Sequence, residues 1–414
     1  MYCDRLATSR LNRLLEQFPA VVIAGARQVG KSTLAEHVLG DRAEIVVFDP
    51  VTDIENARRD PELFLDNHRT PLVLDEIQYA PEVVPALKRR IDRNRTPGQY
   101  LLTGPQQWEV FKSLAESLAG RVAFLDLEAF CLAESARRIE GRSWVERWLD
   151  DPDEFVASRP KRLPAGRALY ERLFRGSLPE TEFLAEDVIP DFHAAYQRTY
   201  IERDARQLGD VTDWQQFGRF FRLAAALTAQ EVNQSQFGRD IGVTPQTARR
   251  WLDVLTATFQ WHEVPAFWRN TVKRISKRPK GYLADSGLAC AALRISSPRA
   301  LADHPALGAI FETAVVGEIR KLISVLSPRP ALHHWRSHGG AEVDLLLERD
   351  GVLHPLEIKV KSRPTRGDAR GIAALRATFP DLRVSRGLVV CAGPEATALT
   401  RLDHAIPWDL APGP

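Results

Sequence analysis

The feature that most constrains this sequence is the segment Gly25-Ala-Arg-Gln-Val-Gly30-Lys31-Ser32, which fits G-x-x-x-x-G-K-[ST] at every fixed position. An apolar run over residues 20–24 precedes it, and a helical pattern over residues 31–39 follows it. In this strand–loop–helix context, backbone N–H groups and a helix N-terminus converge on phosphate oxygens. We therefore expect ATP to bind at Gly25, Ala26, Arg27, Gln28, Val29, Gly30, Lys31, Ser32 and Thr33, with Lys31 catalytic and Ser32 a ligand of Mg²⁺.

Four more β-rich runs follow before residue 130. Each is almost continuously apolar and is separated from the next by a helical stretch, as strands buried on both faces should be. Such alternation is typical of a doubly wound parallel sheet. The runs cover residues 45–50, 71–76, 99–104 and 121–127. The sequence predicts a P-loop NTPase sheet of the α/β class.

Three of these runs carry polar residues that suit nucleotide chemistry. Asp75 is expected to support Mg²⁺ and Glu76 to orient or deprotonate the attacking water, although the pair also suits a helix N-cap. Thr103 follows a buried strand, where its hydroxyl could sense the γ-phosphate; an ordinary Thr-Gly turn is an equal alternative. Arg121 could stabilise transition-state charge in cis or on a neighbouring subunit, and an ordinary surface arginine is nearly as frequent at this spacing.

These motifs resemble a family of prokaryotic AAA-type ATPases with a C-terminal domain of unknown function 4143. Pro105 departs from the family, in which a small hydroxyl residue is expected after Thr-Gly. The resemblance implies a P-loop ATPase domain, a winged helix and a restriction-endonuclease-like domain of the PD-(D/E)xK type. The matching segments are GARQVGKSTL (25–34), LVLDEIQ (72–78), LLTG (101–104), SLAGRV (117–122), YIERDARQLGDV (200–211), GVTPQTARRWLDVL (242–255), KGYLADSGL (280–288), LGAIFETAVVGEI (307–319), AEVDLLLE (341–348) and LEIKV (356–360). The predicted domains are the ATPase at 1–135, a helical connector at 136–230, the winged helix-turn-helix at 231–295 and the nuclease-like domain at 296–414.

Residues 236–245 have the turn and capping residues that are typical of a helix-turn-helix. Gly242 falls in the turn, Thr244 is a suitable N-cap, and Pro245 occupies the first position of the next helix, where its missing N–H costs nothing. That helix has one apolar face, formed by Ala248, Trp251, Leu252 and Leu255. Its other faces carry residues that we expect to contact DNA, namely Gln246, Arg249 and Arg250.

The charge distribution also favours DNA as a partner. The whole chain has 56 Lys+Arg and 54 Asp+Glu, a net charge of +2, whereas nine basic and three acidic residues give the segment 236–280 a charge of +6. Within it, Lys273, Arg274 and Lys277 are expected to form a basic wing that contacts phosphates. The alternative is a protein-docking winged helix with a solvated charged face.

Residues 341–347 and 352–360 are predicted to form two strands. Asp350-Gly351 between them is a preferred two-residue hairpin turn. With that turn, Asp344 lies opposite Glu357, and Glu342 lies opposite Lys359 on the same face.

This pairing predicts a second catalytic site. We expect Asp344 and Glu357 to hold Mg²⁺ or Mn²⁺ and Lys359 to position a water, as the resemblance to restriction-like nucleases implies. Glu312 or Glu318, on the preceding helix, could add another acid. The alternatives are an ordinary cross-strand ion pair and a fold that has lost its chemistry. Pro355 removes one donor and favours an edge or bulged strand.

Cysteine spacing and hydropathy exclude several protein classes. The four cysteines are far apart without a Cys-x-x-Cys pair, which argues against a zinc ribbon or a disulfide scaffold and favours a reducing compartment. The first residues have no apolar leader segment, and the early apolar run is far shorter than the ~18 residues that a membrane-spanning helix needs. We expect a cytoplasmic protein with no membrane partner, which could form a homo-oligomer.

The leading hypothesis is a Mg²⁺-dependent ATPase that binds DNA through a winged helix and carries a nuclease-like domain. A second hypothesis is a nucleotide-gated DNA nuclease. A third is a nucleotide-switched regulatory scaffold without nuclease activity.

Overall fold

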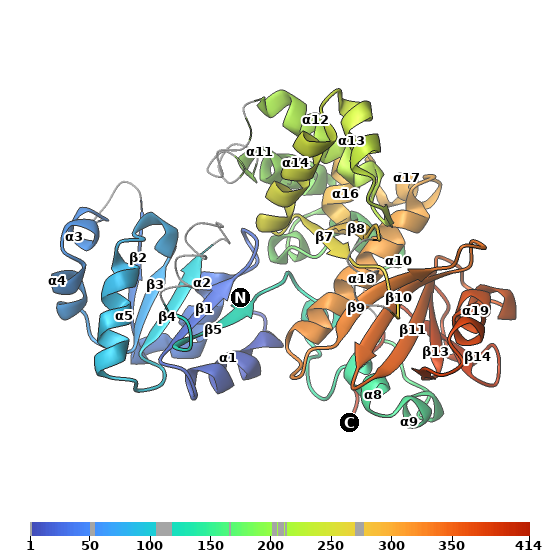
Figure 1. The fold of residues 1–414 in the computed structure, drawn as a ribbon, viewed down its shortest axis with the longest axis horizontal. Coiled ribbons are helices and arrows are strands. Elements are labelled where there is room, and N and C mark those ends of the chain that lie inside the picture. Colours follow the sequence, from blue (N-terminus) through green and yellow to red (C-terminus); the bar gives the residue numbers. More distant parts are fainter. Residues whose placement is uncertain are drawn as a thin grey trace. The chain divides into compact units, whose positions relative to one another are not determined.

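The structure is a computed structural model of the 414-residue chain, and it describes residues 2–49, 54–104, 118–164, 167–200, 205, 211, 213–269 and 277–414. The chain forms two compact units (Figure 1). The first comprises Met1–Ala129 and Ala257–Phe259, and the second comprises Phe130–Thr256 and Gln260–Pro414. The predicted end of the ATPase domain at residue 135 lies close to the first division. The three parts predicted downstream of it fall in the second unit, apart from residues 257–259, which belong to the first.

A parallel five-stranded sheet forms the centre of the first unit, in the order β2-β3-β4-β1-β5. Each strand lies within a run that the hydrophobic pattern predicts, give or take one residue, and the parallel sheet is confirmed. The strands are β1 (Ala20–Ala24), β2 (Glu44–Val47), β3 (Leu72–Asp75), β4 (Tyr100–Gly104) and β5 (Val122–Asp126). The helices are α1 (Ala7–Leu15), α2 (Lys31–Leu39), α3 (Ile54–Arg59), α4 (Pro61–Asp66) and α5 (Val83–Arg93), with short 3₁₀ turns η1 (Gly40–Arg42) and η2 (Ile77–Tyr79).

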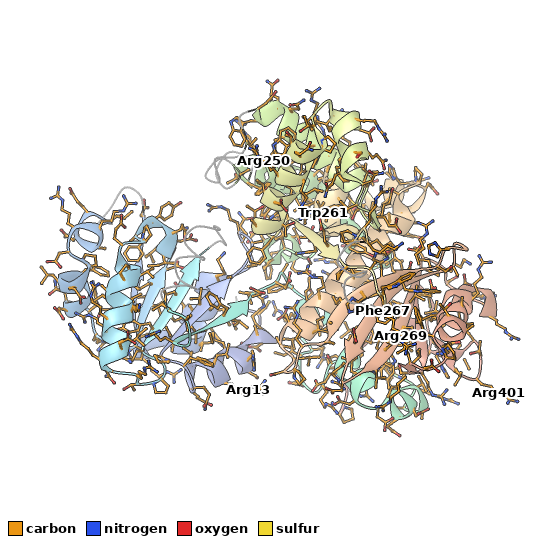
Figure 2. All side chains as sticks on the ribbon, viewed as in Figure 1. Arg13, Arg250, Trp261, Phe267, Arg269 and Arg401 are labelled. Atoms are coloured by element: carbon orange, nitrogen blue, oxygen red, sulfur yellow. The ribbon has the colours of Figure 1, made fainter. Side chains whose placement is uncertain are left out.

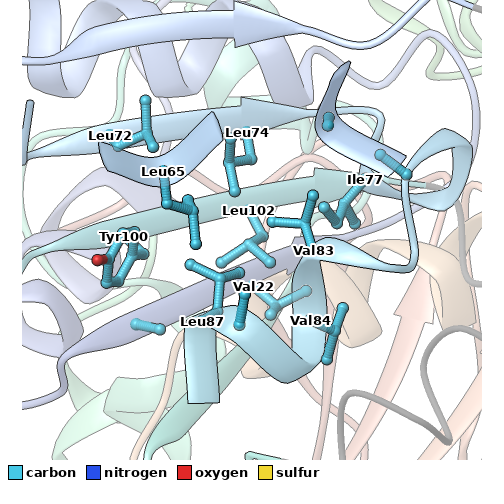
Figure 3. Packing of buried hydrophobic residues seen from close by; sticks show 14 of the residues in the cluster. Val22, Leu65, Leu72, Leu74, Ile77, Val83, Val84, Leu87, Tyr100 and Leu102 are labelled. Atoms are coloured by element: carbon cyan, nitrogen blue, oxygen red, sulfur yellow. The ribbon is translucent and has the colours of Figure 1, made fainter. Parts of the chain in front are cut away.

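The central strands of this sheet are buried at every position. Figure 3 shows Val22, Leu74 and Leu102 from adjacent strands packed with Leu87 of α5 and Leu65 of α4. The edge strand β2 instead alternates partly buried and exposed residues. Because the strands are parallel, the carboxyl ends of β1, β3 and β4 meet at one edge, which brings together the side chains that follow them.

The second unit begins with helices and a small antiparallel sheet in the order β6-β8-β7. The strands are β6 (Gln230–Glu231), β7 (Trp261–Val264) and β8 (Lys280–Leu283). The helices are α7 (Leu132–Ser135), α8 (Trp144–Asp150), α9 (Pro152–Ala157), α10 (Leu169–Arg175), α11 (Ile189–Tyr200), α12 (Trp214–Ala226), α13 (Gln234–Ile241), α14 (Pro245–Ala257), α16 (Ser286–Ala292) and α17 (Pro298–Ala302), with 3₁₀ turns η3 (Pro179–Glu182) and η4 (Glu186–Val188).

The turn between α13 and α14 has the predicted chemistry. Gly242 caps α13 with a φ of 79°, and the Thr244 hydroxyl accepts the Thr247 N–H at 3.1 Å. Pro245 begins α14. The predicted apolar face of α14 is buried, and Trp251 packs edge-on against the ring of Phe217. The capping and turn residues Gly242, Thr244 and Pro245 therefore set where α13 ends and α14 begins.

A mixed sheet in the order β14-β15-β13-β11-β10-β9 forms the C-terminal part of the second unit, with β12 paired to β11. Helices α18 (Leu307–Ser324) and α19 (Arg370–Thr378) pack against it, and η6 (Arg366–Ala369) precedes α19. The strands are β9 (Ala331–Arg336), β10 (Glu342–Arg349), β11 (Val352–Lys359), β12 (Arg383–Val384), β13 (Gly387–Cys391), β14 (Thr397–Ala398) and β15 (Asp403–Pro407).

The hairpin between β10 and β11 has the predicted register. Asp350 and Gly351 have φ values of 52° and 73°, as a two-residue turn with both residues left-handed requires. Arg349 pairs with Val352, and the ladder continues to Leu345 and Leu356.

The expectation that Pro355 marks an edge or bulged strand is wrong. Strand β11 is internal, because β10 lies on one side and β12 and β13 lie on the other. The pairing with β12 ends at Leu353, and the pairing with β13 begins at Leu356. Pro355 falls in the gap between these two partners, so its missing N–H breaks neither of the two parallel ladders.

All four cysteines are buried and none forms a disulfide. Within the described ranges, no helix is long and apolar enough to cross a membrane.

Candidate functional site

The loop between β1 and α2 depends on two glycines. A Cβ on Gly25 would lie 2.3 Å from the Leu127 carbonyl oxygen, so a larger residue does not fit there. Gly30 has a φ of 91°, which favours glycine, and α2 begins at the next residue. Of the other predicted loop residues, Val29 is buried, whereas Gln28 and Thr33 are exposed. The predicted strand–loop–helix geometry is thus formed.

The side chain of Lys31 is folded onto this loop. Its Nζ donates to the carbonyl oxygens of Gly25 at 3.1 Å and Ala26 at 2.9 Å. The side chain is buried, and its ammonium is held by carbonyl oxygens of the loop. A bound nucleotide would therefore exchange these carbonyl contacts for phosphate oxygens, which are stronger acceptors for an ammonium.

Three side chains from separate segments meet beside the loop. The Ser32 hydroxyl lies 2.8 and 3.0 Å from the two carboxylate oxygens of Asp75. Thr103, fully buried at the end of β4, also donates to Asp75. A hydroxyl and a carboxylate held together next to a phosphate loop are the oxygen ligands that Mg²⁺ prefers, so these residues fit the predicted ion.

Glu76 lies next to this group in a left-handed conformation, with a φ of 58°. Its N–H donates to the Thr103 hydroxyl at 3.3 Å, and its carboxylate accepts from the side-chain amide of Gln78. Gln78 was not predicted as a site residue. It is two positions from Glu76 in the sequence, and the 3₁₀ turn η2 folds it back onto the carboxylate.

Arg5 is a second residue that sequence reasoning missed. Only 4% of it is exposed, and its guanidinium donates to the carbonyl oxygens of Val29 at 2.7 Å and Glu128 at 2.6 Å. It thereby ties the phosphate loop to the segment after β5. No local pattern identifies such a residue, because its partners are backbone carbonyls distant in the sequence.

Arg121 does not meet these residues within its own chain. It precedes β5, whose first residue is level with Ala20 at the start of β1, so it lies roughly 20 Å from the phosphate loop along the strands. Its guanidinium donates to Asp92 and to the Ala119 carbonyl. The cis role is therefore corrected, because parallel pairing puts Arg121 at the opposite edge of the sheet. The role on a neighbouring subunit stays a prediction.

The residues predicted to contact DNA differ in their surroundings. Gln246 and Arg250 are exposed on α14, and Arg250 is labelled in Figure 2. Arg249 instead forms ion pairs with Asp253 at 2.6 Å and Glu263 at 3.0 Å. The exposed Lys277 lies 5.3 Å from the ring centre of Trp268, and Lys273 and Arg274 lie outside the described residues.

The predicted C-terminal residues come together at the end of the β10–β11 hairpin. Lys359 Nζ lies 3.0 Å from Asp344 Oδ2 and 2.8 Å from Glu357 Oε2. The N–H of Ile358 donates to Asp344 Oδ2 at 2.8 Å. The Asp344 carboxylate thus bonds to β11 just beyond the last paired residues of the two strands.

The structure decides between the two candidate acids of α18. Glu312 joins the cluster, whereas both oxygens of Glu318 accept the Leu132 N–H, at 3.0 and 3.1 Å. Glu312 is bound by Tyr282, whose hydroxyl donates to Oε1 at 2.8 Å.

Lys280 is the cluster residue that the sequence misplaced. Its ammonium lies 2.7 Å from Glu312, 2.7 Å from Glu342 and 3.4 Å from Asp344. It therefore adds nothing to the basic surface counted for residues 236–280. The hydrophobic pattern does not indicate that a lysine at the start of β8 is buried among carboxylates of α18 and β10.

Burial and charge shift the pKa values of these groups in opposite directions. Burial together with the charge of Asp344 raises the pKa of Glu357 to about 9, and the same two causes raise the pKa of Glu312 to about 7. Burial opposes ionisation of Asp344, but the ammonium groups of Lys280 and Lys359 outweigh it and lower the pKa of this carboxyl. Burial acts against the ammonium of Lys280, but the surrounding acidic groups raise its pKa well above the usual value.

These carboxylates do not fit a divalent cation as they stand. An ammonium already contacts Glu312, Glu342 and Asp344. In the part of the chain that the structure describes, no group of three or more His, Cys, Asp or Glu side chains is arranged to hold a metal ion.

Three family models match successive parts of the chain. Residues 17–136 match the family described as AAA domain, and residues 307–411 match the domain of unknown function DUF4143. Residues 166–299 match another domain of unknown function, DUF8612.

Whole-chain relatives and solved structures are more distant. The chain is 29% identical to uncharacterized protein Rv2008c of Mycobacterium tuberculosis over 98% of its own length and 83% of that protein. The Walker-type ATPase of Pyrococcus abyssi has a TM-score of 0.42 and 14% identity, and covers 70% of this chain and 96% of its own. The RuvB Holliday junction branch migration motor of Thermotoga maritima has a TM-score of 0.29 and 15% identity, and covers 66% and 95%. The matched families show that the chain combines an AAA-type P-loop domain with a C-terminal domain of the type DUF4143.

Proposed function

We propose that this chain is a Mg²⁺-dependent ATPase that binds DNA through a winged helix and carries a restriction-endonuclease-like domain without DNA cleavage. The observation that carries the ATPase proposal is the meeting of Ser32, Asp75, Thr103 and Glu76 beside the phosphate loop. A chance glycine-rich turn would not gather a hydroxyl, two carboxylates and a threonine from three strand ends.

Each residue has a role that follows from its contacts. The loop N–H groups and Lys31 would bind the phosphates, and Ser32 and Asp75 would hold Mg²⁺. When bound, this ion would neutralise charge that develops on the phosphate oxygens. Glu76, once released from Gln78, would orient the attacking water and accept its proton.

ATP turnover by purified full-length protein tests this proposal. Lys31→Ala should abolish ATP binding, whereas Glu76→Gln should keep ATP binding and lower turnover by about 10²–10⁴-fold, because it removes only the proton acceptor. Glu36→Gln is a matched control, because this residue is exposed on α2 and lies outside the phosphate loop. Turnover that survives both Lys31→Ala and Glu76→Gln rejects the assignment.

The DNA-binding part of the proposal rests on element order and exposure. Helices α12, α13 and α14 with strands β6, β7 and β8 follow the order of a winged helix, and Gln246, Arg250 and Lys277 are exposed on it. Arg249 is expected to matter less than the sequence predicts, because Asp253 and Glu263 already pair with it.

Fluorescence anisotropy of a labelled DNA duplex at several salt concentrations tests this part. The affinity for DNA should fall steeply as the salt concentration rises. Arg250→Ala should reduce the slope of log affinity against log salt concentration by the amount that corresponds to about one phosphate contact, and Arg249→Ala should reduce this slope less. Arg13→Ala, at an exposed position of the ATPase unit, is the control. No DNA affinity at low salt would favour a nucleotide-switched scaffold.

The remaining parts of the proposal concern assembly and location. We place the protein in the cytoplasm, as its cysteine usage favours. If it forms a homo-oligomer, Arg121 of one subunit would serve the phosphate site of a neighbour. Mixing Arg121→Ala chains with Lys31→Ala chains tests this role. ATP turnover that is regained on mixing supports a site shared between subunits, and a mixture that stays as inactive as the separate variants opposes it.

A further inference from the structure

The C-terminal carboxylate cluster already contains a cation supplied by the protein. Lys280 is 4% exposed, and its ammonium lies within 3.4 Å of three carboxylates. It comes from β8 of the small sheet, whereas the carboxylates come from α18 and β10. The contact therefore joins two parts of the second unit that are distant in the sequence.

Two of the carboxylates beside Lys280 already direct oxygens at donors of the protein. Asp344 presents Oδ1 to Lys280, and it presents Oδ2 to Lys359 and to the Ile358 N–H. Glu312 Oε1 accepts from both Lys280 and Tyr282. A divalent cation binds carboxylate oxygens at about 2.0–2.6 Å, so it would have to occupy nearly the same space as the ammonium. Two cations this close in a buried site repel each other strongly.

The backbone at Lys280 is fixed in a sheet, which limits how far its side chain can move away from the carboxylates. It begins β8, the middle strand of its sheet, and it pairs with Glu231 of β6 and Val264 of β7. All four residues of β8 are buried. Withdrawing the side chain alone would leave the carboxylates of Glu312 and Glu342 without the ammonium that both of them contact.

We infer that Lys280 is the resident cation of this cluster and that it excludes divalent metal ions from the restriction-like site. The C-terminal domain then uses Asp344 of its D…E-x-K residues, together with Glu312 and Glu342, to bind Lys280 of β8 rather than a metal ion that would cleave DNA. This inference does not depend on ATP turnover, because all of its residues belong to the second unit and the phosphate loop belongs to the first.

Counting bound Mn²⁺ by electron paramagnetic resonance, on the full chain without nucleotide, tests the inference. All variants carry Asp75→Asn, which removes the metal ligand of the phosphate site. With Lys280 in place, the Asp75→Asn protein should bind no Mn²⁺ at the carboxylate cluster. Adding Asp344→Asn to it should therefore leave the Mn²⁺ count unchanged. Lys280→Met, which keeps the length of the side chain without its charge, should gain about one Mn²⁺ per chain, and a further Asp344→Asn change should abolish the gain.

Two controls separate the site from the loss of any lysine. Lys321→Met removes a lysine of the same unit whose Nζ donates to the Phe130 carbonyl, and it should gain no Mn²⁺. Lys280→Arg keeps the charge and should also exclude Mn²⁺.

The result that overturns the inference is Mn²⁺ bound by the chain with Lys280 in place and lost on Asp344→Asn, or equal Mn²⁺ binding with and without Lys280→Met. If Lys280→Met is unfolded in chelator and folds when Mn²⁺ is added, the inference is supported, because the metal then replaces the missing charge. If Lys280→Met does not fold in either condition, the comparison of Lys280-containing chains with and without Asp344→Asn decides the question alone.

Discussion

Replacing Glu318 by glutamine should remove a specific pH dependence of stability. Glu318 is 8% exposed and accepts the Leu132 N–H at the start of α7. Burial raises its pKa from 4.5 to about 7 against the opposing effects of Lys321 and the Leu132 N–H. Below pH 4.5 the carboxyl is protonated in the folded and unfolded chain alike. Between pH 4.5 and 7 only the unfolded chain releases the proton, so the free energy of unfolding falls as the pH rises.

The size of this effect follows from the shift. Each pKa unit corresponds to about 1.4 kcal/mol, so the raised pKa of Glu318 makes the second unit less stable by roughly 2–3 kcal/mol at pH 8 than at pH 5. Glutamine has no proton to release and can still accept the Leu132 N–H. The difference in stability between Glu318→Gln and the unchanged protein should therefore shift by this amount in favour of glutamine as the pH rises.

Urea unfolding followed by tryptophan fluorescence measures this difference. Trp108 apart, the tryptophans of the chain lie at positions 144–408, so the signal reports mainly on the second unit. Glu395→Gln, at an exposed carboxylate of the same unit, is the control and should show no comparable change across pH 5–8. A constant stability difference between Glu318→Gln and the unchanged protein over this range would refute the reasoning.

Three further changes test contacts that the sequence did not reveal. Arg5→Met should weaken ATP binding about tenfold or more in a fluorescent-nucleotide titration, because hydrogen bonds from a charged donor contribute about 1.5–3 kcal/mol each. Arg5→Lys should recover part of the lost affinity, and an unchanged affinity in Arg5→Met would contradict the role of Arg5 in holding the phosphate loop. Gln78→Ala should raise basal ATP turnover without changing the affinity for ATP, because it frees the Glu76 carboxylate; equal turnover would show that the contact does not restrain Glu76. Gly371→Ala should destabilise the second unit by about 1–3 kcal/mol in urea unfolding, since a Cβ there would lie 1.8 Å from the Glu342 carbonyl oxygen; a neutral result means that α19 can shift.

Local sequence patterns predicted the elements that local chemistry builds. Continuous apolar runs identified the five strands of the first sheet, and the Gly–Lys–Ser spacing located the phosphate loop. The Asp350-Gly351 turn fixed the register of the β10–β11 hairpin, because both residues adopt a left-handed conformation that few other residue types tolerate. In each case the determining groups lie within a few residues of one another.

Other contacts were beyond sequence reasoning because their partners are far apart in the chain. Nothing near Arg5 indicates that its guanidinium reaches the Val29 carbonyl. The sequence could not distinguish Glu312 from Glu318 as the acid that α18 contributes. Only the packing of α18 decided that Glu312 meets the carboxylate cluster. Arg121 could be placed at the correct edge of the sheet only by knowing which strands are parallel neighbours.

The sequence by itself determined an AAA-type phosphate loop, a buried parallel sheet and a C-terminal hairpin with acidic residues on one face, since backbone preference and hydrophobic periodicity act over short distances. Only the tertiary structure decided what those acidic residues bind. The same lysine that reads as part of a basic surface in the sequence lies among Glu312, Glu342 and Asp344 once β8 packs beside β10 and α18. A buried charge finds its partner through the packing of distant elements, and no local pattern records that packing.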